Sequence, residues 1–184
     1  MKIALDVDGV LANFYLEFCK LHKMPHKTIT EWEVKWIAEK LHTVDNNEDF
    51  WLRLPIINSP ESISFDFDCY ITSIPEQMKS IREQWLIKNG YPNKPVIVSH
   101  NKLPTMLKLG IDVIIDDKYS TIKSVSDAGL LGIHFIPYFL NPPIIHSINT
   151  KHLYDVPEII KKYKKNKSNG KKMGRPSYIG ANRA

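Results

Sequence analysis

The chain has 184 residues, enough for one domain with a hydrophobic core or for a core domain that carries a modest insertion. Its hydrophobic content of 43% is ordinary for a globular protein, and no apolar run approaches the length that crosses a bilayer. Residues 161–184 hold nine Lys and Arg and no acidic residue, so the net charge of +5 divides into +9 for this tail and −4 for residues 1–160.

The first predicted element is a short buried strand over residues 2–6, which leads into a turn at Gly9. Asp6 ends the apolar run so early that no room remains for the apolar stretch of a secretory signal. We therefore expect a cytoplasmic protein that has no contact with a membrane.

Helical segments are predicted to follow this strand. Apolar residues recur at helical spacing over residues 11–22, and a second helix is predicted to begin at Thr30. A short helical or irregular piece then carries Phe50 and Trp51. We expect these segments to form a small helical cap over residues 14–61, inserted after the first strand.

Strands and helices alternate after the predicted cap. The predicted strands cover residues 67–72, 95–98, 111–116 and 132–136, with helices between them, and a last helix is predicted over residues 153–165. Continuous apolar strands that alternate with helices indicate a parallel sheet covered on both faces. The expected fold is an α/β, Rossmann-like doubly wound sheet, with a catalytic core formed by residues 1–13 and 62–160 and a flexible basic tail at residues 161–184.

Polar side chains are predicted at the ends of four strands. They are Asp6 and Asp8 after the first strand, Thr72 and Ser73 at the second, Lys102 after the third, and Asp116 and Asp117 at the fourth. Because the carboxyl ends of parallel strands lie at one edge of the sheet, we expect these side chains to gather there. Four carboxylates repel one another unless a cation neutralises them, and oxygen ligands suit magnesium. Asp6, Asp8, Asp116 and Asp117 are therefore predicted to bind Mg²⁺.

Magnesium and a lysine beside a carboxylate nucleophile form a site for phosphoryl transfer. The run Asp6-Val7-Asp8-Gly9-Val10-Leu11 resembles the first motif of the haloacid dehalogenase (HAD) superfamily, in which the first aspartate attacks phosphorus. The second aspartate of that motif protonates the leaving group and later activates water. Thr72 resembles the hydroxyl of the second motif, Lys102 the lysine of the third, and Asp116-Asp117 the acidic pair of the fourth. The resemblance implies an HAD-like phosphatase whose catalytic residues are Asp6, Asp8, Thr72 and Lys102.

The longer string from Asp6 to Phe14 resembles the 5′(3′)-deoxyribonucleotidases, as do the strings over residues 71–75 and 115–118. This resemblance implies that the substrate is a nucleoside monophosphate. One alternative is a phosphatase for another small ester or for the end of a nucleic acid strand. The other is a nucleic-acid-binding protein that uses the basic tail.

Several residues leave two interpretations open. Lys108 is a second candidate for the catalytic lysine, although Lys102 directly follows the third strand. Ser73 can contact the substrate phosphate or cap the next helix, and the two roles are compatible. Phe50 and Trp51 either stack on a nucleobase as substrate contacts or pack inside the cap.

The basic tail also has two interpretations. The run Lys171-Lys172-Met173-Gly174-Arg175-Pro176 resembles arms that enter the DNA minor groove, but Met173 stands where such arms carry an arginine. The composition favours a solvated, disordered run of charge. In either form the tail is expected to bind nucleic acid weakly at low salt.

Overall fold

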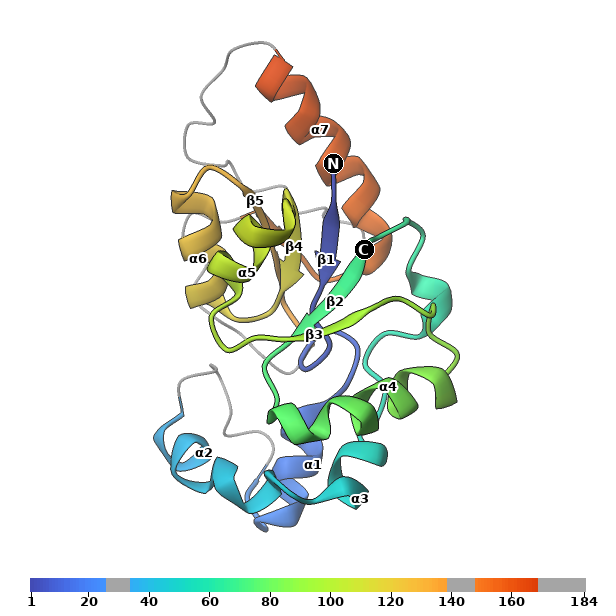
Figure 1. Ribbon diagram of the computed structural model, residues 1–184, viewed down its shortest axis with the longest axis vertical. Helices are drawn as coiled ribbons and strands as arrows, with labels where there is room; N and C mark the ends of the chain where they lie inside the picture. The colour runs from blue at the N-terminus through green and yellow to red at the C-terminus, as the bar shows by residue number, and fades with distance from the viewer. Residues whose placement is uncertain (26–33, 139–147, 169–184) are drawn as a thin grey trace.

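A six-stranded sheet forms the centre of the computed structural model, which describes residues 1–25, 34–138 and 148–168 (Figure 1). The strands are β1 (Ile3–Leu5), β2 (Cys69–Thr72), β3 (Val96–Val98), β4 (Val113–Asp116), β5 (Leu131–Phe135) and β6 (Ile148–Thr150). Their order is β3-β2-β1-β4-β5-β6, and all neighbouring strands are parallel. This arrangement confirms the predicted doubly wound α/β fold.

Helices cover both faces of the sheet. Successive residues of a strand point to opposite faces, so each strand contributes apolar side chains to two buried clusters. Ala4 and Ile114 belong to a buried cluster with side chains of α5 (Lys102–Leu109) and α6 (Tyr119–Asp127). Leu5 and Ile115 belong to a second cluster with side chains of α4 (Lys79–Lys88) and α7 (Val156–Ser168). Both faces of the short strands are therefore apolar, which explains their continuous apolar sequences. One turn of 3₁₀-helix precedes α4 at Glu76–Met78 and another precedes α7 at Leu153–Asp155.

The segment between β1 and β2 is helical, as predicted. It contains α1 (Phe14–Leu21), α2 (Lys35–Lys40), α3 (Glu48–Leu52) and 3₁₀ turns at Leu41–Val44 and Pro60–Ser62. Asparagine side chains begin two of the helices: Asn13 Oδ1 accepts a hydrogen bond from the backbone of Leu16, and Asn47 Oδ1 accepts one from Phe50, both at 3.0 Å. The predicted helix start at Thr30 lies outside the described residues.

This inserted helical segment packs directly on α4. Its buried aromatic side chains belong to the same cluster as Ile81 and Trp85 of α4. The Trp85 indole donates a hydrogen bond of 2.9 Å to the Leu54 carbonyl, and the Trp51 indole donates one of 2.8 Å to the Val44 carbonyl. The aromatic core of the insertion is thus continuous with the core on one face of the sheet.

Five of the six strands match predicted strands within two residues. β6 was not predicted from the sequence, because its three residues include a single apolar side chain, Ile148. Such a short strand is defined by its pairing with β5 and has little pattern of its own. Within the described ranges, no helix is both long enough and apolar enough to span a bilayer.

Candidate active site

The sheet reverses its strand order at β1, which lies between β2 and β4. Ligands of such sheets bind in the crevice beyond the carboxyl ends of the strands at this point. Asp6 directly follows β1, and its backbone N–H donates a hydrogen bond of 2.9 Å to the Ile115 carbonyl of β4. Thr72 ends β2 and Asp116 ends β4. The topology therefore brings three of the predicted site residues to one place.

Lys102 is the first residue of α5 and is buried, with 6% of its surface exposed. Its ammonium nitrogen lies 2.7 Å from Asp6 Oδ2 and 2.7 Å from Asp116 Oδ2. Lys108, near the end of the same helix, is exposed to solvent. Of the two lysines considered from the sequence, the structure brings only Lys102 to the carboxylates.

These three charged groups shift one another's ionisation. Burial raises the pKa of Asp6 to about 8, although the attraction of Lys102 opposes this rise. Burial alone lowers the pKa of Lys102, but Asp116 and Asp6 together outweigh it and raise that pKa. One ammonium group shared by two buried carboxylates leaves one negative charge uncompensated. Lys102 therefore stays charged while Asp6 resists ionisation in the absence of a further cation.

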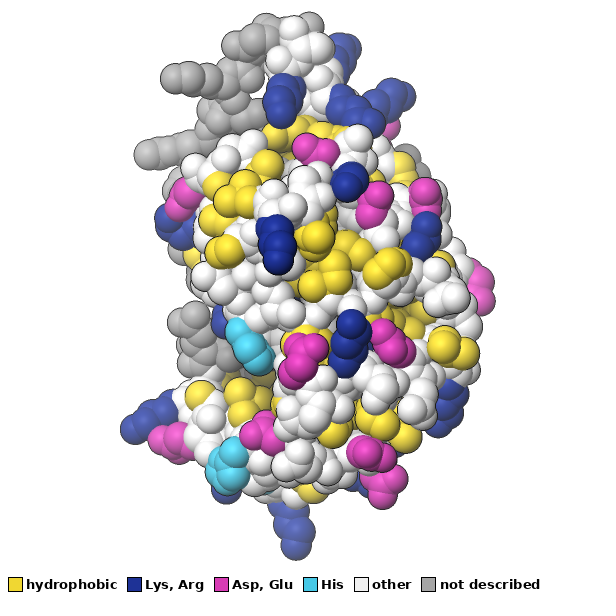
Figure 2. All heavy atoms as spheres, in the orientation of Figure 1, with side chains coloured by type: hydrophobic (Ala, Val, Ile, Leu, Met, Phe, Trp, Pro, Cys, Tyr) yellow, Lys and Arg dark blue, Asp and Glu magenta, His cyan; other side chains and the backbone are white. Residues whose placement is uncertain are grey.

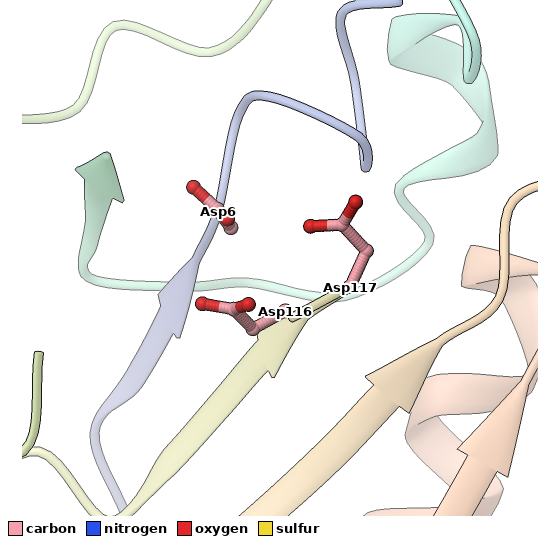
Figure 3. A group of neighbouring side chains, drawn as sticks. All are labelled: Asp6, Asp116 and Asp117. Atoms are coloured by element: carbon pink, nitrogen blue, oxygen red, sulfur yellow. The ribbon is translucent and has the colours of Figure 1, made fainter. Parts of the chain in front are cut away.

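Asp6, Asp116 and Asp117 have the spacing of a metal site (Figure 3). Each is buried, and one carboxylate oxygen from each lies within 4.8 Å of the others. Figure 3 shows Asp6 beyond the end of β1, and Asp116 and Asp117 at the end of the adjacent β4. A set made only of oxygen donors, with an excess of buried negative charge, fits Mg²⁺. The residues present can thus hold this ion.

The loop after β1 approaches Asp117 closely at Gly9. Gly9 has a φ of +83°, and a Cβ atom built there would lie 1.6 Å from Asp117 Oδ2. Only glycine leaves room for this carboxylate. From the other side, His134 of β5 places its Nε2 at 3.0 Å from the Asp117 carbonyl oxygen. Burial lowers the pKa of His134, which favours a neutral ring that donates this hydrogen bond.

The carboxylate of Asp8, which the sequence predicts as a fourth metal ligand, has other partners in the structure. Asp8 is not part of the group of carboxylates with metal spacing. Thr72 Oγ1 donates a hydrogen bond of 3.1 Å to Asp8 Oδ2. Arg82 Nη2 lies 2.7 Å from Asp8 Oδ1 and 2.9 Å from Oδ2. The side chain of Asp8 is therefore held at the end of β2, beside the metal-like cluster.

Arg82 is a site residue that the sequence analysis missed. It lies on α4 and is completely buried. A signal was present, because Arg82 falls four residues after Met78 and four before Leu86, on the apolar face of the predicted helix. A charged residue on such a face requires a buried partner of opposite charge, and the partner is Asp8.

The predicted substrate contacts Phe50 and Trp51 do not lie on an open surface. Their exposed fractions are 0% and 4%, and their rings pack against each other with centroids 5.3 Å apart. Phe14 of α1 lies against both rings. A ring enclosed in this way has no face on which a nucleobase can stack, so the structure favours the second interpretation, packing inside the cap.

Ser73 lies just beyond β2 and is exposed. Its hydroxyl oxygen is 3.0 Å from Nδ1 of His100, a residue that follows β3. No side chain caps the 3₁₀ turn at Glu76–Met78, so Ser73 does not act as the predicted helix cap. Ser73 and His100 instead form a polar pair next to Thr72.

Comparisons with known proteins identify the fold. No family model matches the sequence, and no curated protein matches it. A haloacid dehalogenase-like protein of unknown function from Agrobacterium tumefaciens is similar in structure, with a TM-score of 0.62 at 13% identity over 88% of this chain and 98% of that one. A HAD-superfamily hydrolase of subfamily IA, variant 1, from Geobacter sulfurreducens has a TM-score of 0.52 at 11% identity, over 86% and 98% of the two chains. The chain therefore has the HAD-like α/β fold.

Magnesium is expected to stabilise this protein more at about pH 8.5 than at about pH 5.5. In the metal-free protein the pKa of Asp6 rises from 3.8 to about 8, so the folded state favours the protonated form. That contribution to stability is complete below the lower value and is lost as the pH rises through the higher one. Mg²⁺ binds the carboxylate, so it competes with the proton at low pH and restores the lost stability at high pH.

The measurement is the melting temperature in EDTA and in saturating Mg²⁺ at each pH. At each pH, the melting temperature in EDTA is subtracted from that in Mg²⁺. This subtraction cancels the pH-dependent stability that comes from other titrating groups, such as buried His134. Equal stabilisation by Mg²⁺ at both pH values would contradict the assignment of Asp6 as a ligand.

Proposed function

We propose that this protein is a magnesium-dependent phosphatase of the HAD superfamily that hydrolyses a nucleoside monophosphate. The observation that carries the proposal is the convergence of Asp6, Lys102, Asp116 and Asp117 at the carboxyl ends of β1, β3 and β4. A buried carboxylate beside a buried lysine and a metal-like acidic cluster is the equipment that phosphoryl transfer needs. The structural similarity to a HAD-superfamily hydrolase also supports a hydrolase.

The proposed reaction proceeds through a covalent intermediate. A carboxylate oxygen of Asp6 attacks phosphorus while Asp8 gives a proton to the departing alcohol oxygen. Water then attacks the aspartyl-phosphate, Asp8 takes the proton of the water, and Asp6 is regenerated. Lys102 contributes a fixed positive charge next to the transferred group. When bound by Asp6, Asp116 and Asp117, Mg²⁺ would add charge stabilisation for the phosphoryl oxygens.

The nucleotide part of the proposal rests on sequence similarity to the 5′(3′)-deoxyribonucleotidases over residues 6–14, 71–75 and 115–118. Because Phe50 and Trp51 are buried, a base would be held by other groups. The exposed pair of Ser73 and His100 beside Thr72 offers polar contacts to a substrate that enters over β2 and β3. Another small phosphate ester remains the alternative substrate.

A phosphate-release screen tests the proposal. The purified protein is incubated with ribonucleoside and deoxyribonucleoside monophosphates, sugar phosphates and 3′-phosphorylated oligonucleotides, in Mg²⁺ and in EDTA. We expect release from nucleoside monophosphates in Mg²⁺ and none in EDTA. Preference for sugar phosphates would refute the nucleotide substrate alone, whereas no release from any ester would refute the phosphatase.

Separately, we propose that the basic C-terminal region contacts nucleic acid weakly. Figure 2 shows Lys and Arg side chains gathered at the end of the molecule where α7 lies. Exposed lysines of this helix are Lys161, Lys162, Lys164, Lys165 and Lys167. None of them belongs to the carboxylate site, so the two activities should be separable.

Truncation after Lys165 is expected to leave phosphate release nearly unchanged and to weaken binding to DNA or RNA, because it removes five of the nine basic residues of the tail and keeps four lysines of α7. The cut keeps Val156 and Ile160, the buried residues of α7, so the core should remain folded. Binding of the full-length and truncated proteins is compared at low and near-physiological salt, because counterion release makes such binding salt-dependent. Loss of hydrolysis in a folded truncated protein would show that the tail acts at the active site.

A further inference from the structure

We infer that Arg82 is a positioning residue that fixes the carboxylate of Asp8 for proton transfer at the active site. The inference rests on the proposed function, since it assigns Arg82 a role in the phosphatase reaction. It starts from the contact already described, in which one guanidinium nitrogen donates to both oxygens of Asp8. The Thr72 hydroxyl is a second donor and makes the third hydrogen bond, so the Asp8 carboxylate is fixed from two sides.

The surroundings of Arg82 argue that this contact is its main polar interaction. The side chain has no exposed surface, and its Nε and Nη1 atoms are buried without a hydrogen-bond partner among the described residues. The guanidinium lies over the ring of Trp51 at 5.1 Å and over that of Trp85 at 5.5 Å. These two rings hold the charged group in place and leave Nη2 directed at Asp8.

Stability alone does not account for a buried arginine of this kind. Bringing the ion pair out of water is costly, and apolar residues of similar volume often serve a core equally well. The two buried nitrogens Nε and Nη1, which have no acceptor in the part of the chain that the structure describes, add to that cost. What the arginine provides, and an apolar residue cannot, is a fixed direction for the Asp8 carboxylate.

The direction matters in the step that breaks the ester bond. As the Asp6 oxygen bonds to phosphorus, the bond from phosphorus to the alcohol oxygen breaks and Asp8 supplies the proton that this oxygen takes. A poor leaving group, such as the 5′-hydroxyl of a nucleoside, needs that proton. A nitrophenolate ion leaves without it. A residue that acts by positioning Asp8 should therefore affect the two kinds of ester unequally.

The test compares Arg82→Met with wild type on a nucleoside 5′-monophosphate and on p-nitrophenyl phosphate. The parameter is kcat/KM, which includes only the steps up to formation of the aspartyl-phosphate. We expect a loss on the order of a hundredfold for the nucleotide and of less than about threefold for the nitrophenyl ester, because general acid catalysis is worth about 10²–10⁴ in rate. In an Asp8→Asn background, Arg82→Met should lower the nucleotide value no further.

Melting temperature and circular dichroism check that each variant is folded. If Arg82→Met does not fold, Arg82→Lys takes its place, since it keeps a buried cation and loses the planar guanidinium. The same unequal loss is expected. Equal losses on both esters, or a further loss in the Asp8→Asn background, would overturn the positioning role. A wild-type protein that releases no phosphate would overturn the phosphatase and this role together.

Discussion

Asp6→Asn is expected to abolish phosphate release, with a loss on the order of a thousandfold or more, and to leave the fold intact. An amide is not a competent nucleophile, and it is a weaker ligand for Mg²⁺ than a carboxylate. Because burial raises the pKa of Asp6, its ionised form is unfavourable in the metal-free folded state. A neutral side chain of the same shape should therefore make the metal-free protein at least as stable as wild type at about pH 8.5. Phosphate release and the melting temperature in EDTA are the two measurements.

Asp127→Asn is the matched control for this variant. Asp127 is the last residue of α6, is exposed, and pairs with Lys123 one turn away. It undergoes the same chemical change far from the carboxylate cluster, and surface pairs of this kind contribute little to stability. Activity and melting temperature of this control should match wild type. Substantial turnover by Asp6→Asn would instead exclude a covalent intermediate on this residue.

The sheet was predictable because its strands are buried on both faces. In β4, for example, Val113, Ile114 and Ile115 form a continuous apolar run that Asp116 ends. Asp6 and Asp116 at the strand ends were predictable for the same reason, because each of them ends an apolar run. An unpaired carboxylate is costly to bury, so a carboxylate at such a position indicates a functional site. The parallel arrangement of β1 and β4 then fixes their proximity.

The partners of individual side chains were less predictable than the strands. Whether Trp51 faces a substrate or the cap core depends on how α3 packs on α4, which helical spacing does not specify. The role of Asp8 depended in the same way on Arg82, a residue distant in sequence that reaches it only in the folded chain. Local sequence patterns identify which face of a helix is buried, but they do not identify what lies against it.

Gly9→Ala is the second variant with a large expected effect. The new methyl group would meet Asp117 Oδ2 at 1.6 Å, a distance that no pair of non-bonded atoms tolerates. Either the loop after β1 or the Asp117 carboxylate must then move, and both carry groups of the proposed metal site. We expect Mg²⁺ affinity and phosphate release to fall by at least about tenfold each, because displaced ligands lose much of their binding energy. Calorimetric titration with Mg²⁺ and the phosphate-release assay measure the two losses.

Gly129→Ala separates the effect of crowding from that of backbone strain. Gly129 has a φ of +78°, close to the +83° of Gly9, but a Cβ atom there would meet nothing within 4 Å. Both variants force alanine into the left-handed region, so both should lose about 1–2 kcal/mol of folding free energy. Only Gly9→Ala should also lose Mg²⁺ binding. If the two variants bind Mg²⁺ equally well, Asp117 does not need its position against the loop, and its assignment as a metal ligand is wrong.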